Sequence, residues 1–276
     1  MVAEFTKEGT LLREAANFDP FISCECGQCF RFEINGDSVV LYARRRKLCV
    51  RRCENGFLLE GVGREEYEKI WYDYFDLGRD YGAIIKSFSG DKNISLAAEY
   101  GGGIRIFRQD PWETLVSLII SQNNNIPRIK KIINSLCVLL GEDLGEGNFA
   151  FPTPQAIYGA GVEGLAPIRA GFRAKYIFDA ASKVLSGEVS QERIKNASYE
   201  DALAELKKIK GVGDKVANCV LLFGYGFSQA FPVDVWVKRV ISEYYGEGFD
   251  PASLGEYAGI AQQYLFYYRR NVVGER

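Results

Sequence analysis

The sequence contains no histidine among its 276 residues. This absence excludes Ser-His-Asp and Cys-His catalysis and every metal site that depends on imidazole ligands. Any catalytic chemistry must therefore use carboxylates, lysine, cysteine, amides or backbone groups. Long apolar runs are also missing, since none approaches the roughly 20 residues that a membrane span needs. The N-terminal segment Met1–Arg13 has scattered charges and no signal-peptide pattern, so we expect a cytoplasmic protein, nucleoid-associated in a prokaryote.

Cysteine is scarce, and its count of seven is odd. Without export, the thiols are predicted to stay reduced. The spacings C-x-C-x₂-C at Cys24, Cys26 and Cys29, and C-x₃-C at Cys49 and Cys53, match no usual zinc pattern. We therefore expect no transition-metal site.

A basic excess is missing as well, because the formal net charge is −2. This balance argues mildly against a nucleic-acid partner, since DNA-binding proteins usually carry excess positive charge. Local basic clusters can overcome it, although each alone is typical of a solvated face. The clusters are Arg44–Lys47, Arg51–Arg52, Arg128–Lys131 and Arg269–Arg270.

The residue pattern predicts an α+β fold with two parts. Residues from about 20 to 62 are expected to form an antiparallel sheet, because Asn35-Gly36 and Glu54-Asn55-Gly56 separate β-rich runs and favour hairpins. A helix is predicted over Glu65–Tyr74, and Gly101-Gly102-Gly103 is suited to a linker. The domains are therefore expected to be a small antiparallel β/α domain at 1–103 and an all-helical domain at 104–276.

Helix signals dominate after residue 104. Asp110-Pro111-Trp112-Glu113 is typical of a helix start, with Asp as N-cap, Pro at the first position and Glu reaching back from the third. The further predicted helices are 126–140, 172–187, 198–208, 214–224, 235–245 and 252–270.

The most informative segment lies between two of these helices, at Gly211-Val212-Gly213. Glycines allow a tight turn whose backbone N–H groups, at the start of the next helix, approach a phosphate closely. This predicts a helix-hairpin-helix at about 198–224. Gly61-Val62-Gly63 repeats the tripeptide without such a context. The second copy stands out because Lys215 follows it and Phe231-Pro232-Val233-Asp234 ends nineteen residues after Lys215.

The stretch from Lys207 to Asp234 resembles the helix-hairpin-helix DNA glycosylases, whose signature is a hairpin followed by a Gly/Pro-rich turn and an essential aspartate. Within that superfamily it is similar to the 8-oxoguanine DNA glycosylase/AP lyase branch. Four further motifs follow the order of this branch: Gly27-Gln28-Cys29-Phe30-Arg31, Arg108-Gln109-Asp110-Pro111, Ser121-Gln122-Asn123-Asn124-Asn125-Ile126 and Gly171-Phe172-Arg173-Ala174. The resemblance implies a base excision repair enzyme that acts as a monomer on double-stranded DNA containing 8-oxoguanine.

The resemblance assigns catalysis to Lys215 and Asp234. Lys215 would attack C1′ of the damaged nucleotide, expel the base and leave a Schiff base that permits β-elimination. A cation in a first helical turn is unfavourable, which favours the neutral, nucleophilic amine. Asp234 would stabilise positive charge that develops on the sugar. Without the resemblance, Lys215 is a surface lysine and Asp234 an ordinary N-cap.

The resemblance also implies a pocket for the extruded base. Cys219 and Phe266 would lie on its two faces, and Gln262 would bond its Watson–Crick edge. Gly27 would offer its carbonyl to N7–H, the hydrogen that distinguishes 8-oxoguanine from guanine. Cys219 alone is more typical of ordinary packing, and a glycine in a strand often marks a bulge.

Other implied sites contact the rest of the DNA. Asn123, Arg128 and Arg173 would hold the orphaned cytosine, with Phe172 as the wedge that fills the gap. The backbone at Gly211 and Gly213 would contact a DNA phosphate. A further implied site is a monovalent cation at three hairpin carbonyls, those of Lys207, Ile209 and Val212.

This chain departs from the family at two positions. Trp236 stands where many relatives carry His, and Arg269 stands where an acidic residue is common. No cysteine follows Cys219, which excludes the four-cysteine iron–sulfur cluster that related branches carry after the aspartate. No cofactor is therefore expected to be required.

Two alternatives remain open at this point. One is a helix-hairpin-helix glycosylase of another base specificity, such as alkylated bases, although those relatives generally lack the lysine. The other is a non-catalytic helix-hairpin-helix DNA-binding module, which would not need Lys215 and Asp234 together.

Overall fold

The computed structural model describes residues 1–246 and 248–273 and begins with a six-stranded antiparallel sheet of strand order β1-β2-β6-β5-β4-β3. The strands are β1 (Val2–Phe5), β2 (Gly9–Arg13), β3 (Phe32–Asn35), β4 (Ser38–Ala43), β5 (Arg46–Cys53) and β6 (Gly56–Glu60). The helical segments of this part are α1 (Pro20–Glu25), α2 (Arg64–Glu66), η1 (Tyr67–Trp71), α3 (Tyr72–Tyr74), α4 (Tyr81–Ser87) and α5 (Lys92–Tyr100).

The remaining chain is almost entirely helical, which confirms the predicted fold class. Its helices are α6 (Pro111–Ser121), α7 (Ile126–Leu140), α8 (Pro154–Gly164), η2 (Ala166–Ile168), α9 (Arg173–Leu185), α10 (Gln191–Asn196), α11 (Tyr199–Lys207), α12 (Asp214–Val220), η3 (Leu221–Tyr225), α13 (Val235–Val240), η4 (Ile241–Tyr245), η5 (Pro251–Tyr257), α14 (Ala258–Tyr268) and η6 (Arg269–Val273). A short hairpin, β7 (Asp143–Gly145) and β8 (Asn148–Phe149), interrupts them.

Both predicted hairpins are present, with corrected turns. Asn35 pairs with Ser38 across β3 and β4, so the two turn residues are Gly36 and Asp37 and only Gly36 has a positive φ, +57°. The turn is therefore shifted by one residue from the Asn35-Gly36 pair that predicted it. β5 and β6 close in the same way, with Cys53 opposite Gly56.

Several elements differ from the predictions. The sheet was expected to begin near residue 20, but α1 occupies Pro20–Glu25, because Asp19 accepts hydrogen bonds from the Phe21 and Ile22 amides and Pro20 starts the helix. The strands β1 and β2 were not predicted. The helix α5, which Asp91 caps, was not predicted either, and it ends just before the glycines that were expected to form a linker.

The predicted start of α6 is confirmed in part. The Asp110 carboxylate accepts the Glu113 amide hydrogen at 2.9 Å, as an N-cap does. The Glu113 side chain does not return to residue 110 but forms an ion pair with Arg31 at 3.4 Å. The reciprocal arm of the capping box is therefore replaced by a contact between the two parts of the chain.

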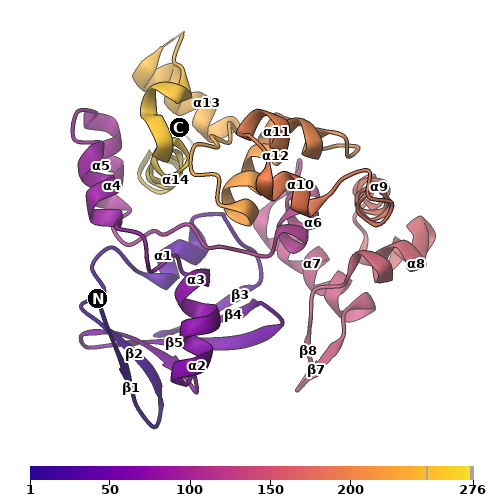
Figure 1. Ribbon diagram of the computed structural model, residues 1–276, viewed down its shortest axis with the longest axis horizontal. Helices are drawn as coiled ribbons and strands as arrows, with labels where there is room; N and C mark the ends of the chain where they lie inside the picture. The colour runs from indigo at the N-terminus through magenta and orange to yellow at the C-terminus, as the bar shows by residue number, and fades with distance from the viewer. Residues whose placement is uncertain (247, 274–276) are drawn as a thin grey trace.

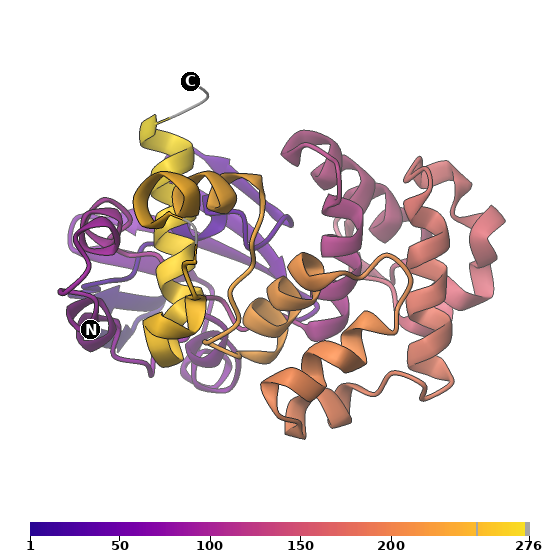
Figure 2. The ribbon, with the colours of Figure 1, turned by 90° about the horizontal axis from the view of Figure 1, so that it is seen from above.

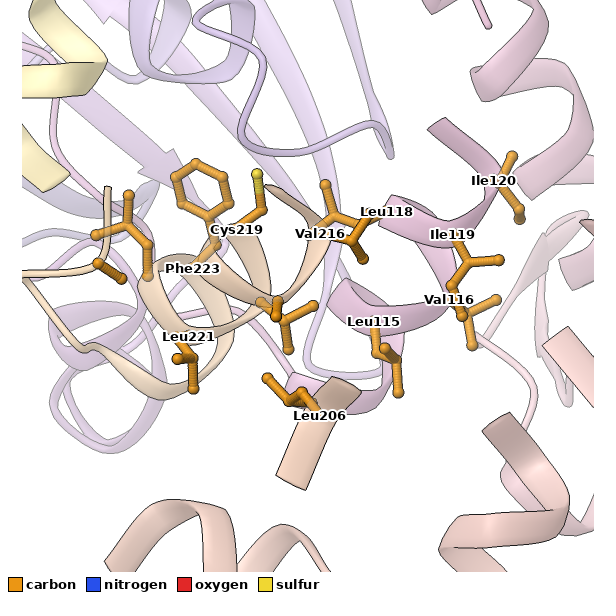
Figure 3. Packing of buried hydrophobic residues seen from close by; sticks show 14 of the residues in the cluster. Leu115, Val116, Leu118, Ile119, Ile120, Leu206, Val216, Cys219, Leu221 and Phe223 are labelled. Carbon is orange, nitrogen blue, oxygen red and sulfur yellow. The ribbon is translucent and has the colours of Figure 1, made fainter. Parts of the chain in front are cut away.

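Two large hydrophobic cores and one small cluster (Phe231, Val237 and Ala258) are present in the described residues. Of the two large cores, one lies against the sheet and contains Trp71, Phe75 and Phe107, and the larger one is built by the helices. Leu115 and Leu118 of α6 and Val216 of α12 belong to the larger core, and Figure 3 shows their two helices facing each other.

The last helix returns to the first part of the chain. α14 packs against α5 and lies beside the N-terminal elements, while α6–α12 extend away from the sheet (Figure 1, Figure 2). Residues near both ends of the sequence therefore meet. Within the described residues, no helix combines the length and apolar character that a membrane crossing requires.

Candidate active site

The hairpin between α11 and α12 has the tight geometry that its glycines predict. Gly211 has φ +79°, and the Val212 amide donates to the Ile209 carbonyl at 3.1 Å. A Cβ at Gly211 would collide with the ring of Tyr176. Glycine is therefore required here both by the backbone conformation and by the close approach of α9.

Helix α9 also holds the hairpin by hydrogen bonds. The Lys210 amide donates to the Asp179 carboxylate at 2.8 Å, and the Lys183 ammonium donates to the Lys208 carbonyl at 2.5 Å. Lys183 and Asp179 pair at 3.4 Å. These bonds fix the position of the turn relative to α9, the helix that begins directly after Phe172, the residue expected to be the wedge.

A cavity of about 210 Å³ lies between the two parts of the molecule. It brings together the residues expected for catalysis and base binding: Lys215, Asp234, Gly27, Cys219, Gln262 and Phe266. They come from the loop after α1, from α12, from the start of α13 and from α14. A concave site with convergent polar groups of this kind is typical of a substrate pocket.

The charges beside the cavity act on Cys219. Burial raises the pKa of the Cys219 thiol, and the nearby Lys215 ammonium, which also hydrogen-bonds it, lowers that pKa. The Asp234 carboxylate acts in the opposite direction on the same thiol. Lys215 and Asp234 therefore both lie close enough to Cys219 to act on the charge state of its thiol, in opposite directions.

Asp234 has the capping role that its sequence position suggested. Its carboxylate accepts the Val237 amide hydrogen at 2.8 Å and begins α13. The cap uses one carboxylate oxygen, Oδ1. The other oxygen can face a positive charge in the cavity, so the capping and catalytic roles are compatible.

The residues expected to read the base also line this cavity. Gly27 has φ +84°, and a Cβ there would lie 3.2 Å from Cε1 of Phe266. Gln262 is 4% exposed, and its Oε1 has no hydrogen-bond partner in the described structure. An unpaired buried amide oxygen is costly unless a ligand supplies a donor.

The residues expected to contact the opposite strand lie outside this cavity. Asn123 (φ +46°) lines a neighbouring groove of about 900 Å³ that also includes Lys215 and Asp234. Arg128 is exposed in the first turn of α7, and Phe172 is 51% exposed. Arg173, in contrast, is only 4% exposed.

Arg173 is engaged by the protein itself. Its guanidinium donates to the carbonyls of Gln122 and Asn123 and lies under the Phe172 ring, 4.5 Å from the centroid. Burial lowers its pKa, and the positive charge of Arg128 lowers it further. Arg173 therefore orients the Asn123 loop and the wedge, with Arg128 nearby.

The two positions that depart from the family have different surroundings. Trp236 lines the cavity, and the Arg239 guanidinium lies 5.1 Å from its ring centroid. Arg269 is buried and pairs with Glu243 at 3.0 Å, while its Nε and Nη1 have no partner in the described part of the chain.

The sequence analysis assigned no role to two glutamines whose buried side chains hold the loop at the pocket. Gln263 donates to the carbonyl of Cys26, and Gln28 binds four backbone or thiol atoms with its buried amide. Nothing in the sequence marks Gln263, because its partner is 237 residues away. In the described residues no group of three or more His, Cys, Asp or Glu could hold a metal ion.

Comparison with known families identifies the class of protein that this fold and cavity define. The family model of HhH-GPD superfamily base excision DNA repair proteins matches residues 116–253, and that of the 8-oxoguanine DNA glycosylase N-terminal domain matches residues 10–115. The chain belongs to the HhH-GPD superfamily and carries the N-terminal domain of the 8-oxoguanine DNA glycosylases. The resemblance inferred from the motifs is thereby confirmed.

Individual relatives point to the same branch. A structure described as MBOgg1 in complex with a low-affinity DNA ligand is 41% identical, covers 100% of both chains and has a TM-score of 0.92. A Clostridium acetobutylicum 8-oxoguanine glycosylase/lyase, solved with DNA containing cytosine opposite 8-oxoguanine, is 37% identical over 98% of both chains, with a TM-score of 0.91. The probable N-glycosylase/DNA lyase of Methanothermobacter thermautotrophicus is 32% identical over 75% of this chain and 75% of its own length.

Proposed function

We propose that this protein excises 8-oxoguanine from duplex DNA with Lys215 as nucleophile and then cleaves the strand by β-elimination. The observation that carries the proposal is the single cavity that contains Lys215, Asp234 and Gly27. A lysine and a carboxylate beside a pocket of base size support base excision through a covalent intermediate. The printed names of the relatives, N-glycosylase/DNA lyase and 8-oxoguanine glycosylase/lyase, support the same substrate.

The chemistry follows from the neighbours of Lys215. The unprotonated amine attacks C1′, the C1′–N9 bond breaks, and the base leaves with that electron pair and takes up a proton. Opening of the sugar ring gives an imine between Lys215 and C1′. Loss of a proton from C2′ then expels the 3′ phosphate. Asp234 stabilises the positive charge that develops at C1′ and on the imine.

Base selection is assigned to the pocket walls. The extruded base lies between Cys219 and Phe266, and the unpartnered Oε1 of Gln262 accepts a hydrogen from its Watson–Crick edge. The Gly27 carbonyl accepts N7–H of 8-oxoguanine and repels the N7 lone pair of guanine. Asn123, Arg128 and Arg173 read the orphaned cytosine, and Phe172 fills the gap in the duplex.

The hairpin is assigned to backbone binding. The amides at Gly211 and Gly213 precede α12 and can donate to a DNA phosphate. A monovalent cation at the carbonyls of Lys207, Ile209 and Val212 would add positive charge beside that phosphate. The carbonyl of Ile209 already accepts one hydrogen bond and keeps one lone pair for such an ion.

The proposal is tested by trapping the imine. The wild-type protein is incubated with an 8-oxoguanine duplex and borohydride, which reduces the imine and fixes the protein on DNA. Lys215→Gln should abolish excision and trapping but retain binding to damaged DNA, because only the nucleophile is removed. Lys195→Gln, an exposed lysine of α10, is the matched control and should be trapped like wild type. Normal excision by Lys215→Gln would disprove the assignment.

Asp234→Asn separates the cap from the catalytic charge. The amide oxygen can still accept the Val237 N–H, so the melting temperature should change little. Excision should fall by about a hundred-fold, because the charge that stabilises the transition state is lost. An Asp234→Asn enzyme that excises at the full rate would reduce the residue to a cap.

A further inference from the structure

The loop Cys26–Gly27–Gln28 presents three consecutive carbonyl groups beside the base pocket. The carbonyl of Cys26 accepts a hydrogen bond from the Gln263 side chain of α14. That of Gln28 accepts one from the Gln109 side chain at 2.8 Å. Gly27 lines the cavity, and in the described structure its carbonyl accepts no hydrogen bond.

Glycine cannot fix this arrangement by itself. Its φ and ψ are less restricted than those of any other residue, so the direction of the Gly27 carbonyl depends on what holds the peptides on either side. The Gln28 side holds firmly, because its buried side chain bonds the Ser23 and Arg105 carbonyls and the Phe107 amide at 2.7–2.8 Å. On the Cys26 side the carbonyl depends on Gln263.

Gln263 is well suited to this task. It is 3% exposed and immediately follows Gln262, the residue assigned to the Watson–Crick edge. Its amide reaches from the last helix to the loop after the first one, a separation of 237 residues. If this donor were lost, the Cys26 carbonyl would be left without its hydrogen bond, and the loop would be free to turn toward another partner.

We propose that Gln263 is a positioning residue for base discrimination, which holds the Cys26–Gly27 peptide so that the Gly27 carbonyl faces N7 of the extruded base. In this proposal Gln263, although it also lines the cavity, acts on base choice through the Gly27 carbonyl. This inference rests on the proposed function, since it concerns the base-reading step of that reaction.

The test compares two substrates on the same variant. The first duplex carries 8-oxoguanine opposite cytosine, and the second carries an abasic site opposite cytosine, whose cleavage needs Lys215 but no base pocket. The concentration of active enzyme is measured by borohydride trapping on the abasic duplex, so a misfolded fraction does not enter the rates.

Gln263→Met keeps the length of the side chain and removes its N–H donor. Single-turnover excision of 8-oxoguanine should fall by about ten- to a hundred-fold, while abasic cleavage stays within about two-fold of wild type. Equal losses in both reactions, or unchanged excision, would overturn the proposal. Tyr264→Phe is the matched control, because it removes a buried contact from the next residue of α14 to the Ile104 carbonyl, away from the pocket.

Gln263→Glu adds a readout that a purely structural role would not change. The ionised carboxylate has no donor and repels the Cys26 carbonyl, whereas the neutral acid can donate. The ratio of excision to abasic cleavage should therefore rise as the pH is lowered, relative to the same ratio in wild type. A ratio that does not depend on pH would contradict the role of the donor. Wild-type protein that fails to excise 8-oxoguanine would overturn the proposed function, whereas a wild type that excises it beside variants with parallel losses would overturn only the role of Gln263.

Discussion

At the scale of single residues, the pocket combines groups that are informative in the sequence with groups that are not. Lys215 and Asp234 stand at a spacing that marks them out once a hairpin is suspected. In the proposed function, Gly27 reads the base with its main-chain carbonyl oxygen. Its specificity is a property of φ +84° and of its neighbours, and not of a side chain.

Gly27→Ala tests the reading carbonyl. A positive φ strains any L residue, and the new methyl group would lie 3.2 Å from the Phe266 ring, so the loop or the ring must move. We expect excision of 8-oxoguanine to fall about ten- to a hundred-fold, the loss of one hydrogen bond in a dry pocket. Abasic-site cleavage should be largely retained, as measured on parallel duplexes.

The contrary outcome is equally specific. If both activities of Gly27→Ala fell together while the melting temperature dropped, Gly27 would support the fold and would not read the base. Gly36→Ala provides a control, since Gly36 also has a positive φ but lies in an exposed turn with open space around it.

At the scale of elements, capping and periodicity predicted most of the helices. The predicted helix 126–140 coincides with α7, and the predicted ranges around α9, α11 and α12 differ from the structure by only a few residues. The helices α8 and α10 were missed. α8 contains three glycines and is interrupted at Gly161, whose φ is +66°, and α10 has only six residues, too few for a clear periodicity. The helix α1 was missed although Asp19-Pro20 carries the same signal as Asp110-Pro111.

The site residues could be predicted where the sequence resembles the family. The residues Lys215, Cys219, Gln262 and Phe266 were named from the sequence, and the structure gathers them around one cavity. The supports of these residues were not predictable. Gln263 donates a hydrogen bond to the Cys26 carbonyl, and the Lys210 amide of the hairpin donates one to Asp179. Both bonds join segments that only the tertiary fold brings close together.

The N-terminal turn of α6 contains a buried acid that yields a prediction about stability. Burial raises the pKa of Glu113 to about 7, against the opposing effect of the Arg31 guanidinium. Between its ordinary pKa and 7, the folded protein therefore holds a proton that the unfolded chain releases. The free energy of unfolding should fall as the pH rises through this window, by up to about 3 kcal/mol.

Glu113→Gln should remove this dependence. The difference in melting temperature between variant and wild type should shift in favour of the variant as the pH rises from 5 to about 8. Glu142→Gln, at an exposed ion pair with Arg45, should show no such shift and serves as the control. A difference that is the same at both pH values would show that Glu113 is ionised throughout.

At the scale of the whole molecule, the chain closes on itself to build the site. The base pocket joins Gly27, near the start of the sequence, to Gln262 and Phe266 on α14, near its end. The residues assigned to the opposite strand come from the middle, at the start of α7 and of α9. The groove that contains Asn123, Lys215 and Asp234 connects the two sets, so both strands of a duplex can be examined on one surface.

This arrangement predicts a dependence on the base opposite the lesion. If Arg128 and its neighbours hold the orphaned cytosine, wild-type excision should be faster opposite cytosine than opposite adenine. Arg128→Ala should slow excision opposite cytosine by about ten- to a hundred-fold, the equivalent of 1–3 kcal/mol for one arginine–base contact. Excision opposite adenine should change little, so the ratio of the two rates should approach one.

Arg128 is the better residue to substitute, because Arg173 also holds the backbone of the Asn123 loop and its removal would alter the loop itself. Lys131→Ala, at an exposed cation further along α7, controls for a general loss of positive charge and should slow both reactions equally or not at all. Single-turnover rates on duplexes that carry each of the four opposite bases provide the measurement. Equal wild-type rates opposite all four, or an unchanged ratio in Arg128→Ala, would mean that the loop and α7 bind DNA without reading the second strand.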